Sequence, residues 1–284
     1  MPDAKTTLFT CDNEEDKGLI WYYESEDAID AEEWFSSYRM YRLDSRATSH
    51  DARSLIWRGE ICWISSAEGK ETGYMLFHCI SQSSFLEQIE RSREMSVLLP
   101  LLNVRGGKIL AHHPRSTEKN WSPFVVDKHL YITYSIVPHA VMHCDWESVR
   151  MLLQCHVVQN ATQSTMPAPP SLGSSSDSSA EQLVPPWLDG ADMRGSSTAM
   201  AWSGAPGSPL PPDEHHFLAL AHVSEHTRTG KVYKYLLYAF SGHGPPFAMT
   251  RFSSLFTLPL PSEPNVDFHC RARQQHAVRL VDFH

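Results

Sequence analysis

The sequence lacks the short motifs of several large enzyme classes. It contains no G-x-x-x-x-G-K-[ST], no G-x-G-x-x-G and no G-x-S-x-G. Neither nucleotide binding on a phosphate loop nor acyl transfer from a nucleophile elbow is therefore indicated. No apolar run reaches the ~18 residues of a membrane-spanning helix, so no membrane span is predicted. The first residues contain no apolar core of a signal peptide, and a cytoplasmic protein is the default expectation.

Cysteine is scarce, and its spacing fits no common metal or redox motif. The six cysteines include no C-x-x-C pair, which argues against a zinc ribbon or a thioredoxin-like site. Several lie inside apolar runs, so we expect buried thiols that behave as small hydrophobic side chains. The adjacent pairs His112-His113 and His215-His216 would face opposite sides of a strand, and no metal site is predicted. Basic residues are also few, and the formal net charge of -9 argues against a nucleic-acid partner.

Amphipathic helical patterns are almost absent, and short strand-like runs take their place. Turn signals separate these runs, at Arg58-Gly59-Glu60, at Asp127-Lys128 and at Arg105-Gly106-Gly107. Residues 84–95 fit either a short helix or an irregular crossover. The pattern predicts an all-β protein, and a sandwich, a barrel and a propeller all agree with it.

Two segments interrupt the strand pattern. Residues 159–193 are rich in Ser, Pro and Gly, and we predict a disordered insertion there. Residues 203–213 have a similar composition and are predicted to form a flexible loop. Because the strand pattern resumes after both, residues 1–284 are expected to form a single domain.

The stretch Glu118-Lys119-Asn120-Trp121 combines several polar groups with one indole just before a strand-like run. Trp121 offers an apolar face for stacking, while its neighbours supply hydrogen-bond donors and acceptors. This composition suits a site that binds a polar ring. The alternative is a turn whose Trp packs into the core.

The run Glu118-Lys-Asn-Trp-Ser-Pro-Phe124, followed by Tyr134-Ser-Ile-x-Pro-His139, resembles a known family of five-bladed β-propeller glycosidases. That family contains the β-mannoside phosphorylases (glycoside hydrolase family 130) and related mannosyl-transferring enzymes. The resemblance implies a five-bladed β-propeller with its site in the central funnel. It further implies an oligosaccharide or glycoside substrate and phosphorolysis or glycosyl transfer. Inorganic phosphate would be a co-substrate, and no cofactor is implied.

The resemblance also suggests roles for single residues. Asp51-Ala52-Arg53 is similar to the family's Glu-Asp-Pro-Arg motif, which implies Asp51 as the proton donor and Arg53 as a ligand of sugar or anion. The alternative for this pair is a surface ion pair of little energetic weight.

In the central loop, the resemblance implies Lys119 as a phosphate or hydroxyl ligand, Asn120 as a hydroxyl partner and Trp121 as a stacking wall. Glu118 would be a second carboxylate or would orient Lys119. His139 is placed to reach a substrate hydroxyl.

Two later segments extend the resemblance. Arg194-Gly195-Ser196-Ser197 is similar to the family's Arg-Gly-Gly-Ser/Thr-Pro element, whose backbone approaches the ligand, and His222 would point into the funnel as a sugar ligand. Tyr233 and Tyr235 are assigned to core packing.

The sequence departs from the family at several places. His50 and Ala52 replace the family's acidic residue and proline, and the chain beyond Pro259 does not follow the family pattern. We therefore expect a truncated propeller, incomplete at its termini and without a closing strand. The departures also favour an alternative function, a non-catalytic carbohydrate-binding or interaction propeller.

Overall fold

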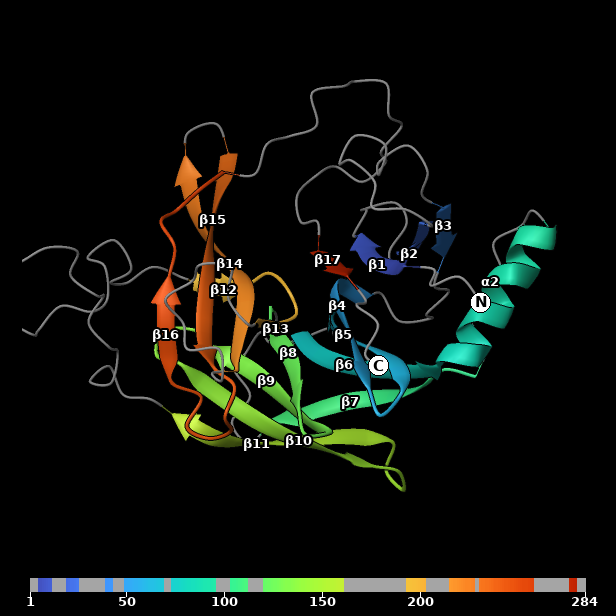
Figure 1. Cartoon of the computed structure of the whole chain (residues 1–284), viewed down its shortest axis with the longest axis horizontal. Coiled ribbons are helices and arrows are strands. Elements are labelled where there is room, and N and C mark those ends of the chain that lie inside the picture. Colours follow the sequence, from blue (N-terminus) through green and yellow to red (C-terminus); the bar gives the residue numbers. More distant parts are fainter. Residues whose placement is uncertain are drawn as a thin grey trace, which may run out of the picture.

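The computed structural model shows an all-β chain with one described helix (Figure 1). The structure describes residues 5–11, 19–25, 39–42, 49–68, 73–95, 103–111, 120–160, 193–202, 215–227, 230–257 and 276–279, and before Ala52 it describes only the backbone. The predicted fold class is thus confirmed at the level of all-β. The predicted insertion at 159–193 and the loop at 203–213 fall almost entirely outside these residues.

The first sheet joins the two ends of the described chain. β1 (Lys5–Cys11) lies between β2 (Leu19–Ser25) and β17 (His276–Arg279), and β3 (Arg39–Arg42) follows β2. All of these pairs are antiparallel. We predicted no closing strand for a propeller; the structure shows a strand near the C-terminus, β17, paired with the N-terminal strand β1. Its short run His-Ala-Val-Arg stands in a polar context that carries little strand signal of its own.

The next four strands form an antiparallel meander. These strands are β4 (Ser49–Trp57), β5 (Glu60–Glu68), β6 (Gly73–Ser81) and β7 (Arg105–Ala111), and α2 (Gln82–Met95) connects the last two. The predicted turn at Arg58-Gly59 is confirmed, because both residues have positive φ, 53° and 75°. That conformation matches the twist of a two-residue hairpin.

A second meander follows, made of β8 (Ser122–Val126), β9 (His129–Ser135), β10 (Ala140–Glu147) and β11 (Leu152–Asn160). Asp127 and Lys128 form its first turn with φ values of 48° and 69°, as predicted. The Trp57 indole donates a hydrogen bond to the Lys128 carbonyl oxygen at 2.8 Å, which ties this turn to the end of β4.

The two meanders join through β7 and β11, which pair in parallel and make one eight-stranded sheet. This junction corrects the turn predicted at Arg105-Gly106-Gly107, because those residues lie inside β7. A Cβ at Gly107 would stand 1.6 Å from the Met151 carbonyl oxygen. The glycines therefore permit a close backbone approach rather than a turn.

The last sheet contains the longest strands. β14 (His216–Thr227) and β15 (Gly230–Ser241) form a long antiparallel pair, flanked by β16 (Met249–Phe252) on one side. The short strands β12 (Met193–Gly195) and β13 (Met200–Trp202) both pair with the other side of β14.

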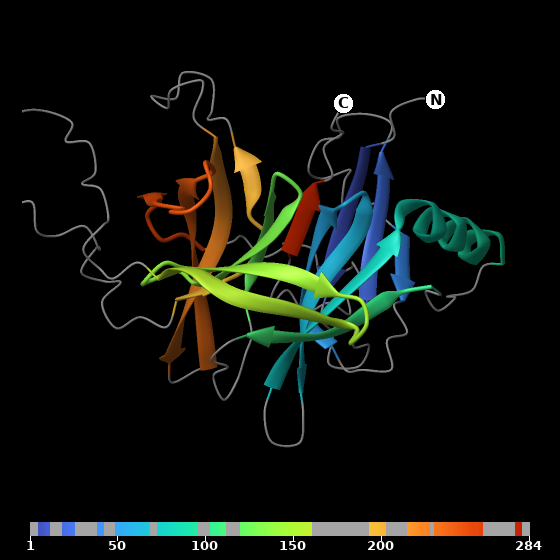
Figure 2. The same ribbon diagram turned by 90° about the horizontal axis from the view of Figure 1, so that it is seen from below.

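These strand groups succeed one another around the molecule in chain order, as the colours in Figures 1 and 2 show. The first strands of successive groups touch, since β1 contacts β4 and β4 contacts β8. The segment after β12 reaches β8 as well, where the Ala199 amide donates to the Pro123 carbonyl oxygen at 3.0 Å. The beginnings of β4, β8 and β12 are thus brought together from distant parts of the sequence.

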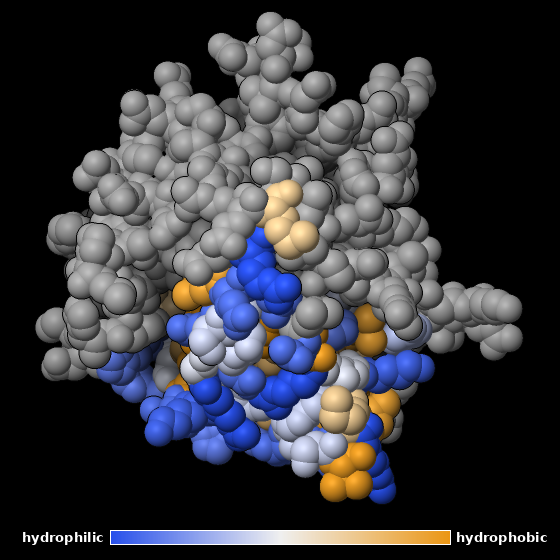
Figure 3. All heavy atoms as spheres, turned by 90° about the vertical axis from the view of Figure 1, so that its right-hand side faces the viewer, coloured by the Kyte–Doolittle hydropathy of each residue, from blue (hydrophilic) through white to orange (hydrophobic). Residues whose placement is uncertain are grey.

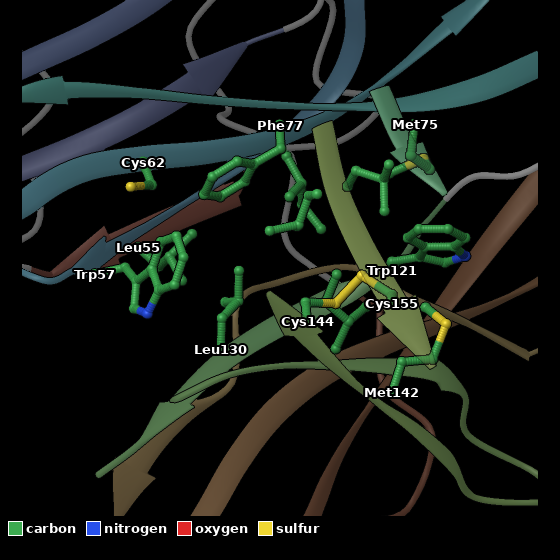
Figure 4. Packing of buried hydrophobic residues seen from close by; sticks show 14 of the residues in the cluster. Leu55, Trp57, Cys62, Met75, Phe77, Trp121, Leu130, Met142, Cys144 and Cys155 are labelled. Atoms are coloured by element: carbon green, nitrogen blue, oxygen red, sulfur yellow. A yellow bond between two sulfur atoms is a disulfide. The ribbon is translucent and has the colours of Figure 1, made fainter. Parts of the chain in front are cut away.

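Two large hydrophobic clusters fill the space between neighbouring groups. One lies between the two meanders and includes Trp57, Phe77 and Trp121 (Figure 4). The other lies between the second meander and the last sheet, where the Phe124 ring is 4.9 to 5.1 Å from those of Phe217, Phe240 and Phe247. A small third cluster packs under α2 around Phe85.

Four of the cysteines are paired. Cys62–Cys79 links β5 to β6, and Cys144–Cys155 links β10 to β11. The prediction of buried thiols was right about burial and wrong about chemistry, because all four side chains are buried as disulfides. A sequence does not reveal that two cysteines face each other across a ladder until the register is known.

The described surface on the α2 side of the molecule is predominantly hydrophilic, with apolar residues in separate patches (Figure 3). Within the described ranges, no helix has the length and apolar character needed to cross a membrane.

Candidate functional site

Arg53, on β4, is the centre of the candidate site. Its side chain is 0% exposed. The Nη2 atom donates to the Asn120 side-chain oxygen at 3.0 Å and to the Gly195 carbonyl oxygen at 3.1 Å. These partners are 67 and 142 positions away in the sequence. One guanidinium therefore connects its own segment with two others that the sequence analysis selected.

Two backbone segments, β12 and the start of β8, approach each other closely beside Arg53. Asn120 has a φ of 63°, a left-handed conformation that non-glycine residues adopt rarely and Asn more readily than most. A Cβ at Gly195 would stand 2.3 Å from the Ser122 hydroxyl oxygen and 2.7 Å from the Asn120 carbonyl oxygen. Only glycine fits this approach of β12 to the start of β8.

Asp51 and Ala52 lie at an irregularity of β4. The pairing register between β4 and β5 shifts between His50 and Arg53, so these two residues occupy a bulge. Bulges bend a strand and redirect side chains, and they are frequent next to active sites. The backbone of Asp51 is thus in the bulge next to Arg53, while its side chain lies outside the described residues.

Ser196 and His222 form a second polar pair beside Gly195. The Ser196 hydroxyl and His222 Nδ1 are 2.5 Å apart, and both side chains are buried. His222 lies opposite Arg194 and Tyr235 in the strand register, and its ring centroid is 5.4 Å from that of Tyr233. The predicted sugar ligand His222 is therefore already hydrogen-bonded within the protein.

Tyr238 is a polar group of this region that the sequence analysis did not select. Burial raises the pKa of Tyr238 to about 12, against the opposing effects of the Ser122 and Thr133 hydroxyls and the positive charge of Arg53. Within the described part of the chain, the hydroxyls of Ser122, Thr133 and Tyr238 make no hydrogen bond of normal geometry. Buried hydroxyls are usually hydrogen-bonded, so these three depend on one another for partners.

Another contact attaches β4 to the segment after β12. The Thr198 hydroxyl donates to the Ser54 carbonyl oxygen at 2.6 Å, and both side chains are buried. Together with the Arg53 bond to Gly195, it fixes residues 195–198 against β4. No sequence signal for this contact exists, because Thr198 and Ser54 are 144 positions apart.

Two of the other predicted residues, Trp121 and His139, pack in the protein interior. Trp121 is 2% exposed and packs in the first core cluster, where its ring centroid is 5.4 Å from that of Tyr134. His139 is buried beside Phe240, and its Nδ1 is 2.9 Å from the Phe247 carbonyl oxygen. Arg194 is half-buried on β12. Glu118 and Lys119 lie outside the described residues.

The arrangement can supply hydrogen bonds and positive charge, and it offers no metal centre. In the part of the chain that the structure describes, no group of three or more His, Cys, Asp or Glu side chains is placed to hold a metal ion. What the site presents is a guanidinium, hydroxyls, an amide and an imidazole, the groups that bind sugar hydroxyls or anions.

No known family is matched by the chain, and no significant sequence similarity to characterised proteins is found.

Proposed function

We propose that the chain is a carbohydrate-active β-propeller that acts on β-mannoside-type glycosides by phosphorolysis or glycosyl transfer. The observation that carries this proposal is the meeting of Arg53, Asn120 and Gly195. These residues were selected one by one through resemblance to a glycosidase family, from segments far apart in the sequence. Random residues so far apart in the sequence would rarely be in contact, so their contact supports the resemblance.

The strand arrangement supports the propeller part of the proposal. In a propeller, four-stranded sheets repeat around a central axis. A strand from one end of the chain commonly completes the sheet that the other end of the chain forms. The described strands form sheets of four, eight and five strands, the eight-stranded sheet consists of two four-stranded meanders, and β17 pairs with β1. The contacts of β4 with both β1 and β8 support the proposal that the first strands of these groups face a common centre.

In the proposed reaction, Asp51 protonates the glycosidic oxygen as its bond to the anomeric carbon breaks. A phosphate oxygen forms the new bond to that carbon and yields a sugar 1-phosphate. Arg53 and Lys119 would hold the phosphate through charge-assisted hydrogen bonds. The β4 bulge supports this role for Asp51, since it sets the residue apart from the regular pairing of the strand.

The experiment measures release of mannose 1-phosphate from a β-mannoside disaccharide and inorganic phosphate. Asp51→Asn should abolish turnover. The matched control is Asp145→Asn, because the Asp145 side chain on β10 is 65% exposed and has no role in the proposed site. Equal turnover in wild type and Asp51→Asn would remove Asp51 from the mechanism.

The second candidate is a non-catalytic carbohydrate-binding propeller, and burial favours it. Arg53, Asn120 and His222 are all buried and already hydrogen-bonded to protein atoms. Side chains that already bind protein atoms would not contact a ligand themselves. They would hold the backbone around the ligand in position. A calorimetric titration with mannose oligosaccharides separates the candidates: binding without turnover supports the second, and absence of binding contradicts both.

A further inference from the structure

Each of the two disulfides links neighbouring strands within one meander, and both are buried in the core between the meanders. Cys62–Cys79 lies in the first meander and Cys144–Cys155 in the second, and all four residues belong to the core cluster between them. Figure 4 shows Cys62, Cys144 and Cys155 in this cluster. In each pair the cysteines face each other directly in the strand register. Cys155 also pairs with Ala111 of β7, within the parallel contact that joins the meanders.

These bridges cannot form or exchange in the folded protein. All four cysteines are 2% exposed or less. Thiol–disulfide exchange requires that a thiolate reach a sulfur atom, so a buried bridge is closed to oxidants and reductants alike. Each bridge must therefore be made while its hairpin is still open to solvent.

We infer that the chain matures in an oxidising compartment, where a disulfide-donating oxidant makes both bridges during folding. For each bridge, two cysteine thiols lose two protons and two electrons, and the donor's disulfide is reduced to a dithiol. Reducing compartments keep such thiols reduced, whereas secretory lumens and the periplasm allow buried pairs to form and persist. This inference replaces the cytoplasmic expectation and does not depend on the sugar site.

The experiment compares full-length chain folded in an oxidising compartment with chain folded and kept under reducing conditions. Non-reducing peptide mapping of the oxidised protein should recover the 62–79 and 144–155 cross-links. With dithiothreitol and a maleimide present, these four cysteines should remain unlabelled in the native protein and become labelled only in denaturant. The reduced protein should melt lower, by ~5–10 °C per missing bridge.

Double variants test each bridge separately. Cys62→Ala/Cys79→Ala and Cys144→Ala/Cys155→Ala should each abolish one cross-link and leave the other intact in the oxidised protein. Should either variant fail to fold, the comparison of reduced and oxidised wild type still decides. A reduced wild-type protein with an unchanged melting temperature, or cysteines that are alkylated in the native state, would overturn the inference.

Discussion

Acidification should destabilise the fold through His139, and the structure sets both the sign and the size of the effect. Burial lowers the pKa of His139 to about 4, although a hydrogen bond with the Phe247 carbonyl opposes the shift. A carbonyl oxygen only accepts, so Nδ1 must carry the proton. Nε2 is then the atom that would be protonated, and it is buried without a hydrogen-bond partner in the described structure.

The sign of the effect follows from proton binding in the two states. Unfolded histidine binds a proton below pH ~6.5, whereas folded His139 stays neutral down to about 4. Unfolding therefore takes up a proton in this window. The stability contributed by neutral His139 is fully present above pH ~6.5 and is lost as the pH falls toward 4. Between pH 7 and pH 5 the loss is about 2 kcal/mol.

Urea unfolding at a series of pH values measures this loss, with His139→Leu as the comparison. The variant should fold, because Gln159 Nε2 also donates to the Phe247 carbonyl oxygen, at 3.0 Å. Its stability should fall less steeply than that of wild type between pH 7 and pH 5, by about 2 kcal/mol. Above pH 7 the two curves should run parallel. Curves that stay parallel down to pH 5 would refute the argument.

Two further predictions concern the polar cluster, and urea unfolding measures both. Arg53→Met should cost at least ~2 kcal/mol, because it leaves the Asn120 and Gly195 oxygens buried without their donor. Tyr238→Phe is its control and should cost much less, and equal losses would contradict the assignment. Gly195→Ala should cost about 1–3 kcal/mol through its contacts with Ser122 and Asn120, and Ser122→Ala should restore only part of it. An unchanged Gly195→Ala protein would refute the close approach.

Local chemistry explains which parts of the fold the sequence predicted. Arg58-Gly59 and Asp127-Lys128 lie between alternating runs, and a two-residue hairpin turn needs residues that accept positive φ. At Arg105-Gly106-Gly107 the same rule failed. There Gly107 approaches the Met151 carbonyl oxygen, and Met151 lies in the turn before β11 of the other meander. A glycine in the sequence indicates that the backbone needs space at that position. The reason becomes clear only when the residue that contacts the glycine is known.

The candidate site was predictable in its residue types and not in its burial. Arg53 and Asn120 were expected to contact a ligand, and the structure places them in contact with each other. A long charged side chain is normally exposed, so the sequence pattern of a single strand does not predict a buried arginine. Its burial depends on acceptors from β8 and β12, which only the tertiary structure supplies. Tyr238 was missed for the same reason.

The burial of Trp121 bears on how a sugar could be bound. An indole with both faces packed in the core cannot also stack on a ring, so affinity would have to come from polar groups. The hydroxyls of Ser122, Thr133 and Tyr238 are the groups near Arg53 that still have hydrogen-bonding capacity within the described structure. These hydroxyls also interact with one another, and they are buried together with Arg53. A sugar bound as proposed would therefore have to compete with their mutual hydrogen bonds, and Trp121 would contribute to the site only through its packing in the core.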